Sequence, residues 1–344
     1  MTVLEKDKSD QIQLIVKKKY HSKRIDKYLV SRLQDYSRSN IQKLIKEEAV
    51  KVNNVAVKNS YEIKLKDVIS IQLPTKDDDH ITPENIPLDV IYEDEYLMVL
   101  NKSPDMVVHP ARGHASGTLV NALAFHCNKL SSINGPLRPG IIHRLDRDTS
   151  GVILVVKDEK VHKHLALQFE ERKIEKEYLA VIKGKSEMDS DKIDLPIGKD
   201  KRDRKKMAIR HDTGKSAVSI FEVIERFFGY TLVRVIPETG RTHQIRVHMR
   251  TIGHPIIADS EYGNSNACYI EDLMKPVKEI HSLAKLKELC NNIDEPIIDR
   301  QALHAYRIKF FHPVYNKTVE FTAEMPEDML NLITTLRRIN ALLN

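Results

Sequence analysis

A dense group of charged and imidazole side chains occupies residues 143–150, between two short apolar runs. The group contains His143, Arg144, Asp146, Arg147 and Asp148. The second run, residues 152–156, is β-branched and has no helical periodicity, which predicts a buried strand. Charges beside such a strand are costly unless they pair or take part in chemistry. In an extended backbone Arg144, Asp146 and Asp148 would project to one side. A solvated turn with two Arg–Asp pairs is the alternative.

A second polar group lies at the predicted start of a helix, within residues 237–253. A turn at residues 238–240 precedes Thr242, the predicted N-cap, and Gly253 and Pro255 end the helix. The spacing predicts a buried face containing Ile245, Met249 and Ile252. His243, Arg246 and Arg250 share a different face. Several cations at a helix start, beside a glycine turn, indicate a site that orders a carboxylate or phosphates.

Composition sets the class of protein. With 344 residues, 41% apolar and 30% charged, the chain has room for one large domain and a small one. No apolar run is long enough to span a bilayer. Cys127, Cys268 and Cys290 lie far apart, which fits a reducing cytoplasm and argues against a disulfide framework or a zinc site.

Charge is unevenly distributed along the chain. Residues 11–74 carry a net charge of +8, whereas residues 75–95 carry −7. The basic part contains two predicted helices, one over residues 24–33 and one after Ser39, which with Gln42 forms a capping-box pattern. Short strands are expected at residues 50–57 and 63–73. Two helices with basic exposed faces and a small sheet form a compact RNA-binding arrangement, although a solvated basic face is the alternative.

The remaining pattern suggests an N-terminal tail (1–17), a small domain (18–74), an acidic linker (75–87) and a large domain (88–344). Beyond the linker the sequence predicts the following elements: a strand, turn and strand at 90–99, a helix capped by Thr118, a helix through Val161, Leu165 and Phe169, a strand at 176–183, a mobile basic loop at 199–210, a helix-like stretch at 277–289 and a C-terminal helix after Pro326. The basic loop is expected to be a second RNA contact.

Residues 143–151, HRLDRDTSG, closely resemble the signature of the RluA-type pseudouridine synthases. Further motifs of that family follow its order: VVHP (107–110), GTLVNAL (117–123), KEYLAV (176–181), DRKKMA (203–208), TGRTHQIRVH (239–248), IGHPI (252–256) and QALHA (301–305). Residues 24–73 resemble the family's S4 RNA-binding domain, except that Glu48, Asn54 and Lys66 stand where its pattern has glycines. The resemblance implies an α+β protein: a small S4 domain followed by a catalytic domain with a mainly antiparallel mixed sheet.

The family's reaction converts uridine to pseudouridine in structured RNA, so the resemblance assigns a role to each matching residue. Asp146 is expected to be the catalytic aspartate, Arg246 its partner, and Tyr178 the ring that stacks on uracil. Arg144 is expected to fill the gap left by the flipped base, with Ile245, His243 and Arg241 also at the substrate. The residues expected to bind RNA more generally are Arg24, Arg38, Lys43, Lys46, Lys205 and Lys206.

The same resemblance implies a cytoplasmic monomer that acts on ribosomal RNA in the large-subunit precursor, without a membrane, a metal or an organic cofactor. Two other classes of function remain open at this point. One is a non-catalytic RNA-binding factor, which would be expected to lack Asp146 or Tyr178. The other is a nuclease or transferase in which Asp146 and Asp148 hold a metal.

Overall fold

The computed structural model describes residues 5–6, 11–20, 23–33, 36, 38–72, 81–110, 116–275 and 294–343. It divides into two compact units, Met1–His80 and Ile81–Asn344. The predicted helix-like stretch at 277–289 lies outside the described residues, as do residues 75–80 of the predicted linker. None of the described helices is long and apolar enough to cross a membrane.

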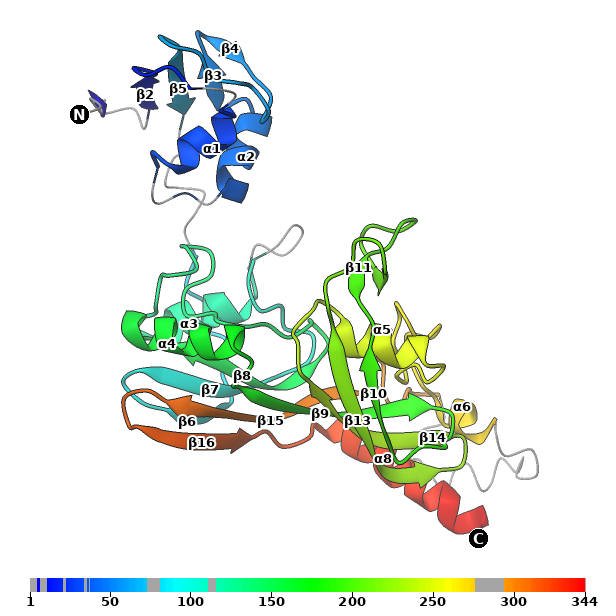
Figure 1. Ribbon diagram of the computed structural model, residues 1–344. Helices are drawn as coiled ribbons and strands as arrows, with labels where there is room; N and C mark the ends of the chain where they lie inside the picture. Colours follow the sequence, from blue (N-terminus) through cyan, green and yellow to red (C-terminus); the bar gives the residue numbers. More distant parts are fainter. Residues whose placement is uncertain are drawn as a thin grey trace. The chain divides into compact units, whose positions relative to one another are not determined.

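The first unit packs two helices on a small antiparallel sheet (Figure 1). Its elements are β1 (Glu5–Lys6), β2 (Gln11–Ile15), α1 (Ile25–Val30), α2 (Arg38–Lys46), β3 (Val50–Val52), β4 (Val55–Ala56) and β5 (Val68–Gln72), with the strands in the order β1-β2-β5-β3-β4. The predicted apolar stripe of the helices is buried, as Ile25, Leu29 and Ile41 show. The predicted capping box is wrong: α2 begins at Arg38, so Ser39 lies inside the helix.

The side chain of Gln42 instead binds Asp26, a fully buried carboxylate on α1. Arg24 and Arg38 each place Nη2 3.0 Å from Asp26 Oδ2, so both guanidinium groups are already paired within the unit. Burial alone would raise the pKa of Asp26, but the hydrogen bonds from Gln42, Arg38 and Arg24 outweigh burial and lower it to about 2. Arg38 and Gln42 on α2 therefore hold the two helices together through Asp26, while Arg24 binds the same carboxylate from the start of α1.

Three turns of the first unit have the backbone geometry that the S4 pattern assigns to glycine. Glu48, Asn54 and Lys66 have φ values of 59°, 68° and 72°. A left-handed backbone costs an L-residue roughly 1–2 kcal/mol, less for asparagine. The turns are kept without their glycines because strand pairing on either side, such as Val50 with Ile71, fixes the backbone.

We expect Asp26→Asn to destabilise the first unit by about 2 kcal/mol at neutral pH. Because the folded pKa is depressed, this stabilisation is present above the unfolded pKa near 4 and is lost as the pH falls toward 2. Hydrogen exchange in α1 and α2 should be about 30-fold faster in the variant at pH 7. Glu47→Gln, which removes an exposed partner of Lys43, is the control and should change little. Equal exchange in both variants would contradict this role for Asp26.

The second unit is built on one large sheet, as the family resemblance implied. Its strands are β6 (Val90–Glu93), β7 (Leu97–Lys102), β8 (Ser150–Val156), β9 (Glu175–Lys183), β10 (Ser190–Asp194), β13 (Val218–Phe227), β14 (Tyr230–Pro237), β15 (Leu303–His312) and β16 (Lys317–Thr322). The order is β10-β13-β14-β9-β15-β8-β7-β6, with β16 paired to β15. All pairs are antiparallel except β8 with β15, so the sheet is mixed and mainly antiparallel.

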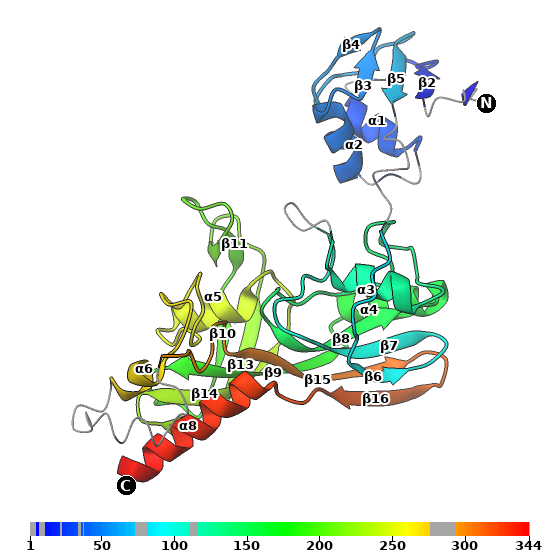
Figure 2. The same ribbon diagram turned by 180° about the vertical axis from the view of Figure 1, so that it is seen from behind.

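Helices lie on both faces of this sheet (Figures 1 and 2). They are α3 (Leu119–His126), α4 (Glu159–Glu170), α5 (Gln244–Thr251), α6 (Ile270–Met274) and α8 (Glu327–Leu343). Thr118 caps α3 as predicted, by accepting the N–H of Asn121. The C-terminal helix begins directly after Pro326, and its predicted apolar face is buried, including Met329 and Leu332.

The basic segment 199–210 is not simply a loop, in contrast to the prediction. Part of it forms a two-stranded hairpin, β11 (Ile197–Lys199) with β12 (Met207–Ile209). The basic side chains lie mainly between the strands, where Arg202 and Lys205 are exposed. Backbone pairing at the two ends of the segment needs no apolar periodicity, so the charge run concealed it.

Candidate active site

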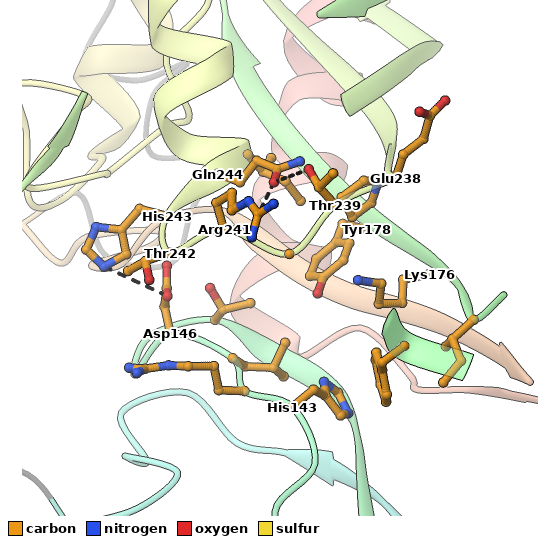
Figure 3. Close-up of a pocket in the computed structure, with 18 of the residues that line it drawn as sticks. His143, Asp146, Lys176, Tyr178, Glu238, Thr239, Arg241, Thr242, His243 and Gln244 are labelled. Atoms are coloured by element: carbon orange, nitrogen blue, oxygen red, sulfur yellow. Dashed lines mark hydrogen bonds and ion pairs between the residues drawn. The ribbon is translucent and has the colours of Figure 1, made fainter. Parts of the chain in front are cut away.

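A cavity of about 580 Å³ lies between the loop before β8, the strands β9 and β15, and the loop after β14 (Figure 3). It is lined by all seven side chains predicted for catalysis and substrate binding: Asp146, Tyr178, Arg246, Arg144, Ile245, His243 and Arg241. Sheet register explains the convergence. Tyr178 on β9 pairs with Ala305 on β15, which in turn pairs with Gly151 on β8.

The segment that carries Asp146 is a loop rather than an extended strand, so the expectation that three charges share a face is wrong. A turn closes it, since the Thr149 N–H donates to the Asp146 carbonyl oxygen at 3.2 Å. Arg147 pairs with the neighbouring Asp148 at 2.8 Å, which is one of the two Arg–Asp pairs of the simpler interpretation. Asp146 makes no such local pair and points into the cavity. We call residues 143–149 the Asp146 loop.

The strand after the Asp146 loop is fixed to β15 by close backbone packing. A side chain at Gly151 would place its Cβ 2.2 Å from the Ala305 carbonyl oxygen, and φ is +110°, so only glycine fits. Beside it, Ser150 and His304 are hydrogen bonded at 3.0 Å, and the other ring nitrogen of His304 lies 3.1 Å from a carbonyl oxygen. Burial lowers the pKa of His304 to about 4, which keeps this ring neutral.

Two buried cations hold the backbone of the Asp146 loop itself. Lys102 donates to the Arg147 carbonyl oxygen at 2.7 Å and to two further carbonyls. Burial lowers the pKa of Lys102 to about 7. Arg300 donates to the Asp148 carbonyl oxygen at 3.0 Å while its guanidinium pairs with Asp328 at the start of α8. Sequence reasoning missed both groups, because each acts on backbone atoms that a sequence does not display.

Helix α5 starts one residue later than predicted. His243, not Thr242, is the residue before its first turn, and its backbone is left-handed with φ 54° and ψ 22°. No side chain caps the helix. Instead Gln244 Oε1 accepts from the Thr239 hydroxyl at 2.6 Å and from the Arg241 N–H at 3.0 Å. This arrangement fixes residues 238–243, the α5 entry loop, and turns His243 toward the cavity (Figure 3).

Arg246 lies at the centre of a buried ion cluster. Its Nε and Nη2 atoms bind the carboxylate of Asp259 at 2.7 and 2.8 Å, and its Nη1 donates to Asp146 Oδ2 at 3.1 Å. Glu261 approaches Nη2 at 3.4 Å, and the ring of Tyr262 lies 5.0 Å from the guanidinium carbon. Burial opposes the charge of Arg246, but Asp259 and the other carboxylates outweigh it and raise the pKa of the guanidinium. The predicted pairing with Asp146 is present, but the fully buried Asp259 is the closer partner.

His243 connects this cluster with the basic hairpin. Its Nε2 lies 3.9 Å from Asp146 Oδ1, while its Nδ1 lies 3.2 Å from Glu261 and 2.8 Å from the Tyr262 hydroxyl. That hydroxyl also accepts the Met207 N–H at 2.9 Å, on β12. The position of the hairpin and that of the imidazole are therefore coupled through one tyrosine.

Tyr178 and Lys176 form the opposite wall, projecting from alternate positions of β9 (Figure 3). Burial, together with the charge of Asp146, raises the pKa of Tyr178, so its phenol is protonated at neutral pH. Burial lowers the pKa of Lys176 to about 8. Lys176 belongs to the KEYLAV motif, yet sequence reasoning gave it no role.

The predicted RNA-binding residues differ in their surroundings. Lys43 and Lys46 are exposed on α2, and Lys205 is exposed on the hairpin. Lys206 is partly buried, with its ammonium 3.3 Å from the Glu261 carbonyl oxygen. Of the site residues, Arg144 is exposed, as a group at the rim of the cavity should be.

Asp259 and Glu261 are the acidic residues of the site that sequence reasoning missed. They follow Arg246 by 13 and 15 positions in a loop whose polar residues look like an ordinary turn. The one available signal is the apolar run Ile256–Ala258 directly before Asp259, since an acid that ends a buried run needs a partner. No group of three or more metal-ligating side chains is found in the described ranges.

Comparison with known proteins agrees with this geometry. The family model "RNA pseudouridylate synthase" matches residues 96–251, and "S4 domain" matches residues 23–69. "Uncharacterized RNA pseudouridine synthase YlyB" of Bacillus subtilis is 42% identical, over 96% of this chain and 99% of that protein. "Ribosomal large subunit pseudouridine synthase D" of Zymomonas mobilis is 39% identical, over 91% of this chain and 93% of that protein. The chain belongs to the RNA pseudouridine synthase family, and is therefore an isomerase.

Within that family it is an RluA-type enzyme with an N-terminal S4 domain, as the sequence motifs indicated. Two solved human structures share the fold at low identity. RNA Pseudouridylate Synthase Domain Containing 1 has a TM-score of 0.52 at 23% identity, covering 71% of this chain and 85% of that one. RNA Pseudouridylate Synthase Domain Containing 4 has a TM-score of 0.51 at 21% identity, covering 72% of this chain and 93% of that one.

Replacing Arg246 with methionine should remove both stability and activity. The change leaves Asp259 and Asp146 without their shared cation, and losing one member of a buried pair typically costs about 3–5 kcal/mol. Arg246→Lys should be intermediate, because an ammonium cannot donate to Asp259 twice and to Asp146 at once. Denaturant midpoints and turnover of the purified variants measure both effects.

Arg250→Met is the matched control, since Arg250 is exposed one turn further along α5. It should keep wild-type stability and change only RNA affinity. If Arg246→Met behaved like Arg250→Met, with an unchanged midpoint and weaker RNA binding, Arg246 would be a phosphate contact and not the centre of an ion cluster.

Proposed function

We propose that this enzyme isomerises specific uridines of large-subunit ribosomal RNA, using Asp146 and neither a metal nor an organic cofactor. The observation that carries the proposal is the convergence of Asp146, Arg246 and Tyr178 on one cavity. Support for the RNA class comes from the S4 match and from relatives named for the large ribosomal subunit.

The reaction breaks the N1–C1′ bond of uridine, turns the uracil, and joins C5 to C1′. A carboxylate can serve it as nucleophile or as counter-charge to the sugar. In this cavity Arg246 donates to Oδ2 of Asp146, whereas Oδ1 has only His243 nearby at 3.9 Å. We assign Oδ1 as the reacting oxygen, with Oδ2 held by the guanidinium so that the carboxylate keeps its orientation.

The other residues hold the base and close the gap it leaves. Tyr178 supplies an aromatic face across the cavity from Asp146, suited to stack on uracil (Figure 3). Ile245 is a buried apolar wall, and Arg241 and His243 extend the α5 entry loop toward the substrate. Arg144, exposed at the rim, is placed to enter the helix stack, which offsets part of an unstacking cost of roughly a few kcal/mol.

Asp146→Asn tests the proposal, because it keeps size and removes charge. Turnover of the purified variant should fall at least about a thousandfold, while RNA affinity stays within a few-fold. Cells in which the variant replaces the wild type should lose pseudouridines from large-subunit RNA, as mapped nucleotide by nucleotide. The in vitro assay contains EDTA and a short RNA that folds without divalent ions, and the wild type should be fully active there. A much smaller loss of turnover in the variant, or wild-type inhibition by EDTA that a divalent ion reverses, would contradict this mechanism.

The first unit is proposed to add affinity without taking part in the chemistry. Deleting residues 1–80 should weaken RNA binding and lower the slope of log K against log salt by about one unit for each phosphate that this unit neutralises. Turnover at saturating short RNA should largely remain. The full-length double variant Lys43→Gln, Lys46→Gln should reproduce about two units of that change, since both side chains are exposed. An unchanged slope in both proteins would show that the basic helix face is only solvated.

A further inference from the structure

The end of the cavity around β9 carries positive charge that the described part of the protein does not neutralise. Four cations line the cavity besides Arg246 and the histidines: Arg144, Arg172, Lys176 and Arg241. In the described ranges none of the four has a carboxylate within ion-pair distance. Two acids line the same wall: Glu238, which is paired with Lys192 at 3.2 Å, and Glu170, which is exposed. Arg144 belongs to the Asp146 loop, so the cations of this end are Arg172, Lys176 and Arg241, which outnumber its two acids.

Lys176 and Arg241 are half-buried, whereas Arg144 and Arg172 are exposed. The Lys176 ammonium lies 5.9 Å from the centre of the Phe169 ring and beside the turn at Gly240. Partly burying an ammonium without a counter-charge is unfavourable, so a lysine at such a position is suited to an anionic ligand. Asp146 does not supply that charge, since it pairs with Arg246 on the other side of the cavity (Figure 3).

The surroundings of Lys176 suit a phosphate group in particular. A Cβ built on Gly240 would meet no atom nearer than the lysine ammonium, at 3.9 Å, so a ligand can approach this turn closely. The next residue, Arg241, uses its Nε to donate to the Ser216 carbonyl oxygen at 3.0 Å. Its two terminal nitrogens have no partner among the described residues, and its side chain lines the same cavity. A lysine and a guanidinium fork beside an open glycine turn match the oxygens of a phosphodiester.

We propose that Lys176, with Arg241, binds the phosphodiester that adjoins the target uridine in the RNA strand. Lys176 and Tyr178 stand at alternate positions of one strand, so a base stacked on Tyr178 brings its own backbone to Lys176. The inference rests on the proposed function, and it names a backbone contact rather than a base contact. Uracil is neutral, so a lone cation gains more from a phosphate than from a uracil carbonyl.

The test measures binding of a short target RNA over a range of salt, in the Asp146→Asn background so that the RNA is not converted. Lys176→Met should bind roughly tenfold more weakly at low salt and lower the slope of log K by about one unit. Lys176→Arg should restore the slope. Lys173→Met is the matched control: it is an exposed lysine near the start of the same strand, paired with Glu171, and should leave both quantities unchanged.

RNAs with a single neutral methylphosphonate linkage then locate the contact. Neutralising one linkage beside the target should weaken binding to the protein that keeps Lys176 more than binding to Lys176→Met, in which Arg241 still contacts that linkage. Equal losses in both proteins at every linkage, or an unchanged salt slope, would overturn the proposal. A variant that binds normally and loses only turnover in the Asp146 enzyme would place Lys176 in the chemistry instead. Absence of pseudouridine formation by the wild type would refute the proposed function, whereas these binding results can fail while wild-type activity is intact.

Discussion

The buried guanidinium of Arg246 is the constraint on which the rest of the site depends. At 5% exposure its charge needs partners, and Asp259, with no exposed area, supplies two hydrogen bonds. Asp259 is itself held by the N–H groups of Glu261 and Tyr262, each at 3.0 Å. This fixes α5 against the loop that follows it. Of the guanidinium nitrogens, Nη1 is then left to face the cavity, and it donates to Asp146.

Sheet order explains why long loops are needed to complete that contact. Asp146 precedes β8 and Arg246 follows β14, and two strands, β9 and β15, lie between them. Three strand spacings separate β8 from β14 by about 14 Å. Asp146 and Arg246 must therefore meet across the two intervening strands, and Tyr178 on β9 lines the cavity that they border. Gly151, Lys102 and Arg300 fix the backbone on the Asp146 side of this contact.

Elements with an apolar pattern were predictable, because burial of one face decides their position. The stripe of α8 and the β-branched run of β8 are examples, and the family motifs brought Asp146, Tyr178 and Arg246 to one site. Features decided by backbone atoms were not predictable from the sequence. Thr242 has the better capping side chain, yet the Gln244 amide satisfies the entry loop, and α5 starts at Gln244. Asp259 was missed because its partner lies 13 residues away and no periodicity connects them.

The cavity separates charge along its length, and the separation suits an RNA nucleotide. Around Arg246 three carboxylates surround one guanidinium, and of these Asp146 is the one that lines the cavity. The other end has Lys176 and Arg241 without acidic partners in the described part of the protein. A phosphodiester is repelled by the first end and attracted by the second, whereas uracil, being neutral, can lie between them. The charge distribution alone would therefore orient a flipped nucleotide, with its backbone toward β9 and the glycosidic bond toward Asp146, before any base-specific contact forms.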